Sequence, residues 1–287
     1  MRLMIFILMA YWGIHSANAQ LVGITQKFQN LPSPLPKSIT LDTTKLVVLF
    51  QYSYPTDNFQ DGFQKVKDIL CFQVGKKMCK TFSHNLYLWD RNLTYQEENP
   101  VRFRMDYINY TIFSNYPTGY TTEENRIPNS RLLQGAIQVV SYTEPMPTLQ
   151  WELLESKDSI LGYYCQTAKC SFRGREWMVW YTPQIPSTLS VWKFSGLPGL
   201  ILKAEDSTGD YCFSAIEISS KSVPIEMYQW KPIKKTRSQW RKIEANMYEH
   251  PADYFLSNKD ISVLRQKDQE EIPTEEWSVR YNPIEKE

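Results

Sequence analysis

Apolar and polar residues alternate with a period of two over much of this chain, which is the pattern of half-buried β-strands. Leu149, Trp151 and Leu153, for example, are separated by polar residues. Stretches rich in β-branched and aromatic residues predict further strands: 45–54, 69–90 around a turn at Gly75, 107–113, 171–182, and 199–218 around a turn at 207–209. From residue 149 onward, the pattern predicts an antiparallel meander.

The segment FSGLPGLILKA, residues 194–204, predicts a rigid turn that leads into a buried strand. Gly196 and Gly199 permit a positive φ or a close backbone approach, and Pro198 fixes its own φ. In the strand that follows, the apolar residues 200–202 must point to alternate faces. We therefore expect both faces of this strand to be sheltered from water.

The predicted strand that ends near residue 182 has the same property. Trp177, Val179 and Tyr181 point one way, and Met178 and Trp180 point the other way. An exposed tryptophan leaves roughly 150–250 Å² of mostly apolar surface in water, which costs several kcal/mol. The protein's own helix and loops can bury one face of this strand. A second sheet, the far wall of a curled sheet, or an apolar ligand can bury the other face.

The strongest helical pattern spans residues 236–248. Trp240, Ile243 and Met247 recur there at helical spacing, and Thr236 or Ser238 supplies the N-cap. The combined patterns predict a mainly β (α+β) fold. We expect an antiparallel, strongly curved sheet or half-barrel, with a C-terminal helix and loops covering one side.

Residues 1–19 have the features of a secretory signal peptide. Arg2 is followed by an apolar stretch, and Ala17-Asn18-Ala19 matches the cleavage pattern. We expect residues 20–287 to be exported to the periplasm or beyond as a single β-rich domain. The cleavage point has no cysteine for a lipid anchor, and no later apolar run reaches the roughly 18 residues of a transmembrane helix.

The charge balance gives no reason to expect nucleic acid as a partner. Removal of Arg2 leaves one basic residue fewer than the 32 of the full chain, which matches the 31 acidic residues. Charge is nevertheless uneven, with a basic stretch at 231–242 and an acidic one at 268–276. We interpret these as a solvated helix face and a loose tail, residues 268–287, with partner docking as the alternative.

Five cysteines in an exported chain permit disulfides. Cys165 and Cys170 flank the sequence QTAK, and Cys71 and Cys79 flank FQVGKKM. Both spacings are compatible with a disulfide across the end of a β-hairpin. Cys212 would then be the odd thiol, or a competitor for Cys165 or Cys170. Free buried thiols are the alternative.

A longer signature runs from YYCQTAKC through SFRGREWMVWYTPQIP to WKFSGLPGLI. In this order the segments resemble the GLPGLI family, exported proteins of bacteria with an outer membrane. The resemblance is best over residues 151–218, and its central motif is Gly196, Leu197, Pro198, Gly199, Leu200 and Ile201. The family has no established activity, so the resemblance implies export and kinship but no substrate.

The sequence offers no catalytic residue, metal site or cofactor motif that we can assign. Once the signal is removed, His84 and His250 remain, which is too few for a three-histidine zinc site. The glycine-rich and nucleophile-elbow motifs of common enzymes are absent. Arg173 and Arg175 share a predicted strand face and could bind a carboxylate or phosphate, or serve structural pairing.

Three functions remain open from the sequence. The first is a non-enzymatic protein of the cell envelope that carries a lipid or other apolar ligand, or chaperones an envelope protein. Its ligand site would comprise Trp177, Met178, Trp180, Trp192 and Phe194, with Arg173 and Arg175. The second is an interaction module of an outer-membrane uptake or secretion complex, which would expose aromatic side chains in residues 183–194. The third is a hydrolase with an unrecognised site.

Overall fold

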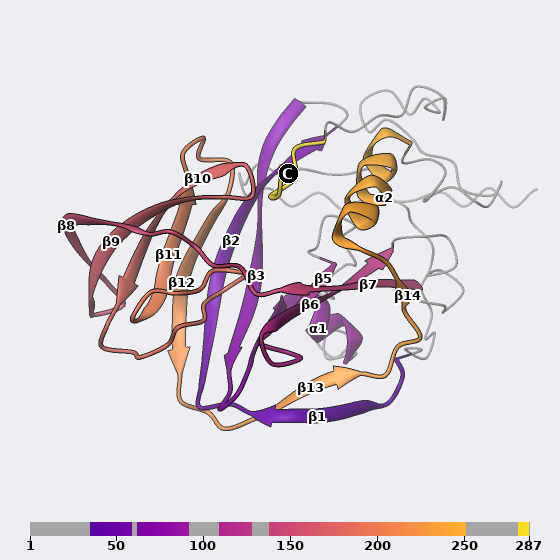
Figure 1. The fold of residues 1–287 in the computed structure, drawn as a ribbon, viewed down its shortest axis with the longest axis horizontal. Helices are drawn as coiled ribbons and strands as arrows, with labels where there is room; N and C mark the ends of the chain where they lie inside the picture. The colour runs from indigo at the N-terminus through magenta and orange to yellow at the C-terminus, as the bar shows by residue number, and fades with distance from the viewer. Residues whose placement is uncertain (1–34, 59–61, 92–108, 128–137, 251–280, 287) are drawn as a thin grey trace, which may run out of the picture.

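The computed structural model of the protein describes residues 35–58, 62–91, 109–127, 138–250 and 281–286. One large, curved sheet dominates the fold (Figure 1). Its twelve strands, in spatial order, are β14 (Ile233–Lys234), β7 (Gln138–Pro145), β6 (Tyr120–Ile127), β5 (Tyr110–Ser114), β4 (Cys79–Ser83), β3 (Gly62–Val74), β2 (Leu46–Asn58), β12 (Cys212–Ser219), β11 (Leu200–Asp206), β10 (Arg175–Thr182), β9 (Tyr163–Phe172) and β8 (Glu152–Ile160).

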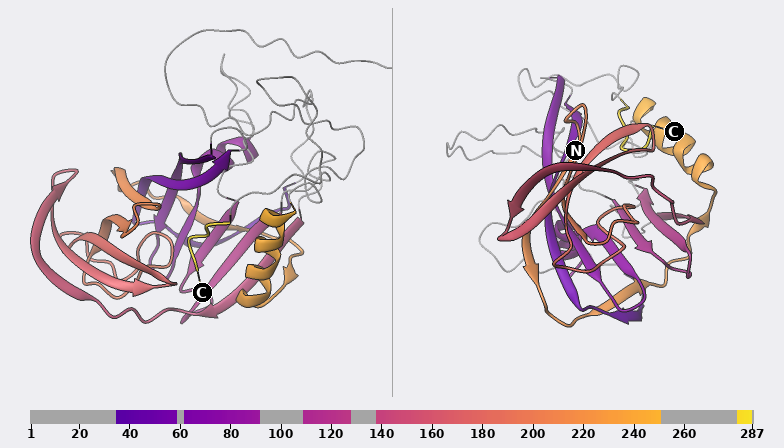
Figure 2. Two further views of the ribbon diagram at one scale, coloured as in Figure 1. Left: turned by 90° about the horizontal axis from the view of Figure 1, so that it is seen from above. Right: turned by 60° about the vertical axis from the view of Figure 1, so that its left-hand side comes forward.

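Neighbouring strands of this sheet are antiparallel except for the short parallel contact of β14 with β7. The sheet does not close, because β8 and β14 are separate edges. Figure 2 shows how strongly it curves. The fold is therefore the mainly β, half-barrel architecture that the sequence predicts.

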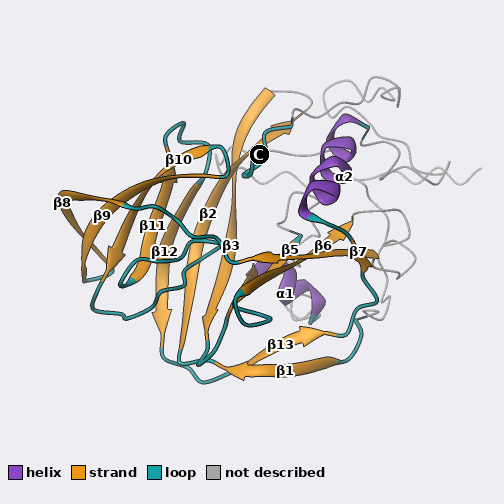
Figure 3. Ribbon diagram, viewed as in Figure 1, coloured by secondary structure: helices purple, strands orange, loops and turns teal. Residues whose placement is uncertain are grey.

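The smaller elements lie around this sheet (Figure 3). Strands β1 (Ser38–Thr43) and β13 (Pro224–Tyr228) form a separate antiparallel pair. Helix α1 (His84–Asp90) replaces the strand expected around His84, and the predicted C-terminal helix is present as α2 (Arg237–Glu249). Among the described residues, no helix is long and apolar enough to cross a membrane.

Helix α2 forms as its sequence predicts. The side chain of Thr236 accepts a hydrogen bond from the backbone of Gln239, whose own side chain accepts one from Thr236 N. This capping box satisfies two of the amide groups that the first turn leaves free. Trp240, with Ile243 and Met247, packs the helix against Val140 of β7 and its neighbours.

The tight turns of the meander lie at Leu161-Gly162 and Arg173-Gly174. All four residues have a positive φ, between 51° and 81°. Positive φ at both central positions is the geometry of a two-residue hairpin turn that matches the twist of the strands. The turn that we predicted between Cys165 and Cys170 is therefore absent, since both residues lie within β9.

The predicted disulfides do not form, and all five cysteines are free. Five residues along one strand separate the Cα atoms of Cys165 and Cys170 by about 16 Å, whereas a disulfide spans at most about 7 Å. Cys71 and Cys79 lie on adjacent strands, but Cys71 faces Phe82 and Cys79 faces Val74. Neither pair is positioned to form a bridge.

The expected burial of both faces is observed for β11 but not for β10. Leu200, Ile201 and Leu202 are all buried, so both faces of β11 are covered there. On β10, Trp177 is buried with Val179 and Tyr181, but Met178 on the other face is 42% exposed. The core therefore lies on one side of this part of the sheet, and the outer face meets solvent.

The two glycines of the opening turn serve different purposes. Gly196 has a φ of +95°, whereas at Gly199 an added Cβ would lie 2.2 Å from the backbone oxygen of Thr182. A positive φ disfavours any side chain, while a backbone clash requires two chain segments to separate. Both of the roles predicted from the sequence are present in one turn.

We predict that Gly199→Ala destabilises the protein by about 3 kcal/mol, because the clash is with backbone. Gly196→Ala is the matched control, with an expected cost of about 1 kcal/mol for the left-handed backbone. Urea denaturation of the two variants measures the difference. An equal effect of both substitutions would contradict the close approach at Gly199.

Candidate functional site

The aromatic residues predicted to line a ligand site do not form one site. Trp177, Trp192 and Phe194 are each 1% exposed and pack on one another, with ring centroids 5.1–5.4 Å apart. Met178 and Trp180 lie on the opposite face of β10, where the Lys203 ammonium sits 4.2 Å from the Trp180 ring centroid. The first three are core residues, so residues 183–194 do not expose the aromatic side chains expected of an interaction module.

The two candidate arginines both bind carboxylates, but at separate places. Arg173, in the β9–β10 turn, contacts Glu144 at 2.6 Å. Arg175, the first residue of β10, contacts Asp206 at 2.6 Å, and both of those side chains are 1% exposed. These contacts are the structural pairing that was the alternative for Arg173 and Arg175, and binding of an external carboxylate or phosphate stays a prediction.

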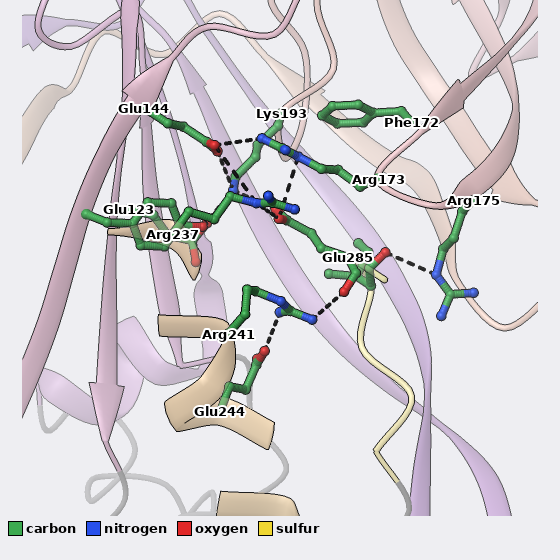
Figure 4. A network of polar contacts seen from close by, with 12 residues as sticks. Glu123, Glu144, Phe172, Arg173, Arg175, Lys193, Arg237, Arg241, Glu244 and Glu285 are labelled. Atoms are coloured by element: carbon green, nitrogen blue, oxygen red, sulfur yellow. Dashed lines mark hydrogen bonds and ion pairs between the residues drawn. The ribbon is translucent and has the colours of Figure 1, made fainter. Parts of the chain in front are cut away.

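Lys193 is the centre of a buried ion cluster (Figure 4). Its side chain is fully buried, and its Nζ lies 2.9 Å from Glu123, 3.0 Å from Glu144 and 2.6 Å from Glu285. The ammonium also donates to the Tyr142 hydroxyl at 2.8 Å. Burial alone lowers the pKa of Lys193, but the surrounding carboxylates raise that pKa well above its ordinary value.

Five different parts of the chain supply this cluster. Glu123 comes from β6, Glu144 from β7, Lys193 from the loop between β10 and β11, and Arg237 from α2. Glu285 belongs to the C-terminal segment, which lies between the sheet and α2 in Figures 1 and 2. Residues far apart in sequence thus meet at one buried point.

Glu285 is bound by three cations at once. Besides Lys193, Arg237 contacts its carboxylate at 2.7 Å and Arg173 at 3.6 Å. Burial raises the pKa of Glu285, but the three cations outweigh it and lower the pKa to about 2. Glu285 is therefore ionised in the folded protein over the whole neutral range.

Arg175 binds the three residues that precede Glu285 in the C-terminal segment. This guanidinium donates to Asn282 Oδ1 at 2.7 Å, to the Pro283 carbonyl at 2.7 Å and to the Ile284 carbonyl at 3.0 Å. Tyr211 donates its hydroxyl to the Asn282 carbonyl at 2.5 Å. The expectation of a loose tail is therefore wrong for residues 281–286, while residues 268–280 and 287 of that predicted tail lie outside the described residues.

We call the residues that hold this segment the tail socket. They are Arg173, Arg175, Lys193, Asp210, Tyr211, Arg237 and Arg241. Of these, only Arg173 and Arg175 were site candidates from the sequence. Arg237 and Arg241 belong to the basic stretch and contact Glu285, whereas Lys231, Lys234 and Lys242 of the same stretch are exposed.

The described residues contain no group of three or more side chains arranged to hold a metal ion. His84 is the first residue of α1, and its ring stacks on Tyr87. The arrangement at the tail socket offers ionic and hydrogen-bond recognition of a peptide.

Comparison with known proteins gives only a distant likeness. No protein-family model matches the chain, and no curated protein matches its sequence. A structure of PNGF-II in the P21 space group has a TM-score of 0.48 and 12% identity, covering 71% of this chain and 33% of that one. PNGF-II in the C2 space group gives 0.46, 13%, 71% and 32%. The chain thus spans about a third of the length of PNGF-II.

We predict that Glu285→Gln lowers the stability at neutral pH by about 3 kcal/mol, because the buried Lys193 ammonium loses one of its three carboxylate partners and Arg237 and Arg173 lose a contact. The carboxylate favours the folded state above its ordinary pKa of 4.5, and this contribution is lost as the pH falls toward about 2. The variant should therefore lose less stability than the wild type over that window.

Urea denaturation at pH 7, 5, 4 and 3 measures both effects. Glu152→Gln is the control, because the Glu152 side chain is 65% exposed in its pair with Lys169. It should follow the wild type at every pH. Parallel stability curves for Glu285→Gln and the wild type below pH 5 would show that the buried pairs do not set the acid sensitivity.

Proposed function

We propose that this protein is a non-enzymatic binding module that holds an extended acidic peptide in the tail socket. In the structure the occupant is the protein's own segment, residues 281–286. Partners that present a similar segment would bind at the same place. The resemblance to an exported family and the signal-like residues 1–19 support partners in the cell envelope.

The observation that carries this proposal is the set of cations around Glu285. Lys193, Arg237 and Arg173 contact its carboxylate at 2.6, 2.7 and 3.6 Å. The Lys193 side chain is fully buried, so its ammonium depends on nearby carboxylates for compensation. An occupant without a carboxylate would remove one of the three that Lys193 contacts among the described residues, which is costly in a poorly solvated site.

The socket also contacts the residues before the glutamate individually. The amide of Asn282 accepts from Arg175 and donates to Asp210 at 3.0 Å, so both ends of its side chain are bound. Ile284 packs against the main apolar core. A segment of the form Asn-Pro-Ile-Glu therefore fits by side chain as well as by backbone.

The close packing of Trp177, Trp192 and Phe194 favours this module over an apolar carrier. These rings fill the space in which an acyl chain would have to lie. The outer-face residues Met178 and Trp180 belong to a sheet surface that also carries Lys203 and Glu205, which form an ion pair. That mixed surface does not resemble an apolar groove.

We predict that the chain ending at residue 280 binds a synthetic peptide of residues 280–287 added in solution. A Glu285→Gln peptide should bind at least about tenfold more weakly, because a charge-assisted contact contributes about 1.5–3 kcal/mol. A Lys286→Ala peptide is the matched control and should bind normally, since the Lys286 side chain is exposed. Isothermal titration calorimetry measures all three affinities.

If the shortened chain does not fold, the full chain can be cut within residues 251–280 after folding. Exchange of the retained segment with a fluorescent peptide then reports the same affinities. A folded, shortened chain that ignores the peptide would rule out the proposed function. Equal binding of the wild-type and Glu285→Gln peptides would rule out recognition of the carboxylate.

A further inference from the structure

A second group of titratable residues lies on the other face of the sheet. Glu123 and Glu124 are neighbours on β6, so their side chains leave the strand on opposite faces. Glu123 joins the cluster around Lys193, whereas Glu124 lines a small cleft of about 30 Å³. This cleft is separate from the tail socket.

The cleft has a floor of β-strands and two walls. Lys80 and Phe82 of β4, Phe113 of β5 and Glu124 form the floor, while α1 and β13 contribute the walls, including Tyr87 and Tyr228. Figure 3 shows α1 and the β1–β13 pair on this part of the sheet. Arg126 donates to both carboxylate oxygens of Asp90, at 2.8 and 2.6 Å, and this bidentate pair fixes α1 to β6.

Lys80 presents a primary amine to the cleft. Its Nζ donates to the Glu226 backbone carbonyl at 2.7 Å and lies 4.6 Å from the Phe82 ring centroid. It forms no ion pair within the part of the chain that the structure describes. Burial lowers the pKa of Lys80 to about 8, although Cys71, Glu226 and Glu124 oppose the shift. A larger share of this amine is neutral, and so nucleophilic, than of an ordinary lysine.

Glu124 is a buried carboxyl group without a bonded partner. The residue is 8% exposed, and among the described residues its side chain has neither a hydrogen bond nor an ion pair. Burial raises its pKa to about 7, with Lys80 and Arg126 acting in the opposite direction. A group of this kind can both donate and accept a proton at neutral pH.

Lys80 and Glu124 line the same cleft but do not pair with each other. A nucleophilic amine and a proton donor that are separated by a small aromatic cleft can act on one molecule placed between them. The volume limits the bound part to a functional group and a few attached atoms. A planar carbonyl group fits this arrangement, because its carbon accepts the amine and its oxygen accepts a proton.

We propose that the cleft binds a small aldehyde or ketone reversibly, as an imine on Lys80. The neutral amine attacks the carbonyl carbon, and one of its protons passes to the former carbonyl oxygen. Glu124 then protonates the resulting hydroxyl, which leaves as water while the C=N bond forms. The product is an iminium ion on Lys80 beside an ionised Glu124, and addition of water reverses the step.

The test is reductive trapping on the full chain at neutral pH. Acetaldehyde and cyanoborohydride, in limiting amount, convert each imine to a stable secondary amine, and peptide mass spectrometry locates the modified lysines. Lys80 should be modified at least about tenfold faster than Lys76 and Lys77, because burial lowers the pKa of Lys80 and leaves more of its amine neutral. Lys76 and Lys77 are exposed residues of the same β3–β4 hairpin and serve as internal controls.

Two variants distinguish the proposed reactivity of Lys80 from an effect of solvent exposure alone. Glu124→Gln keeps the shape but removes the proton donor, so Lys80 should react at least about tenfold more slowly while Lys77 is unchanged. Lys77→Arg should leave the rate at Lys80 unaltered. Faster modification of Lys76 and Lys77 than of Lys80 in the wild type would overturn the proposal. An unchanged Lys80 rate in a folded Glu124→Gln variant, checked by near-ultraviolet circular dichroism, would overturn the role of Glu124.

Discussion

The buried ammonium of Lys193 is the constraint on which the rest of the structure depends. An isolated charge in a protein interior loses its hydration and must be compensated by close partners with good geometry. Lys193 finds these partners on β6, on β7 and in the C-terminal segment. The curved sheet, the loop between β10 and β11, helix α2 and the last residues of the chain must all be in place together.

The same loop also completes the apolar core. Trp192 and Phe194 flank Lys193 and point into the aromatic cluster with Trp177 and Phe213. In the turn that follows, Gly196 has a positive φ, and Gly199 allows a close approach to the backbone of β10. Correct packing of two large rings therefore sets the position of the ammonium between them. Any movement of Lys193 away from its carboxylate partners would therefore also disturb the packing of Trp192 and Phe194 in the core.

Local signals in the sequence were enough to predict β2 to β5, the meander β8 to β12, the capped helix α2 and the two special glycines, but not β6, β7 or helix α1. They were not enough to place the hairpin turn near Cys165, because the positive-φ pair Leu161-Gly162 competes with the spacing of the cysteines. The tail socket is a different case. Lys193 and Glu285 are 92 residues apart, and Lys193 and Glu144 are 49 apart. No periodicity or motif spacing connects such positions, so only the folded sheet brings them together.

A tethered segment also sets the terms on which the tail socket can accept a partner. Residues 281–286 belong to the same chain as the tail socket, so they compete for it intramolecularly. A free peptide with the same contacts must match the effective concentration of this segment before it displaces it. A partner at lower concentration needs further contacts outside the socket. Under the proposed function, occupancy by the protein's own segment therefore sets the minimum affinity that a partner needs to bind the tail socket.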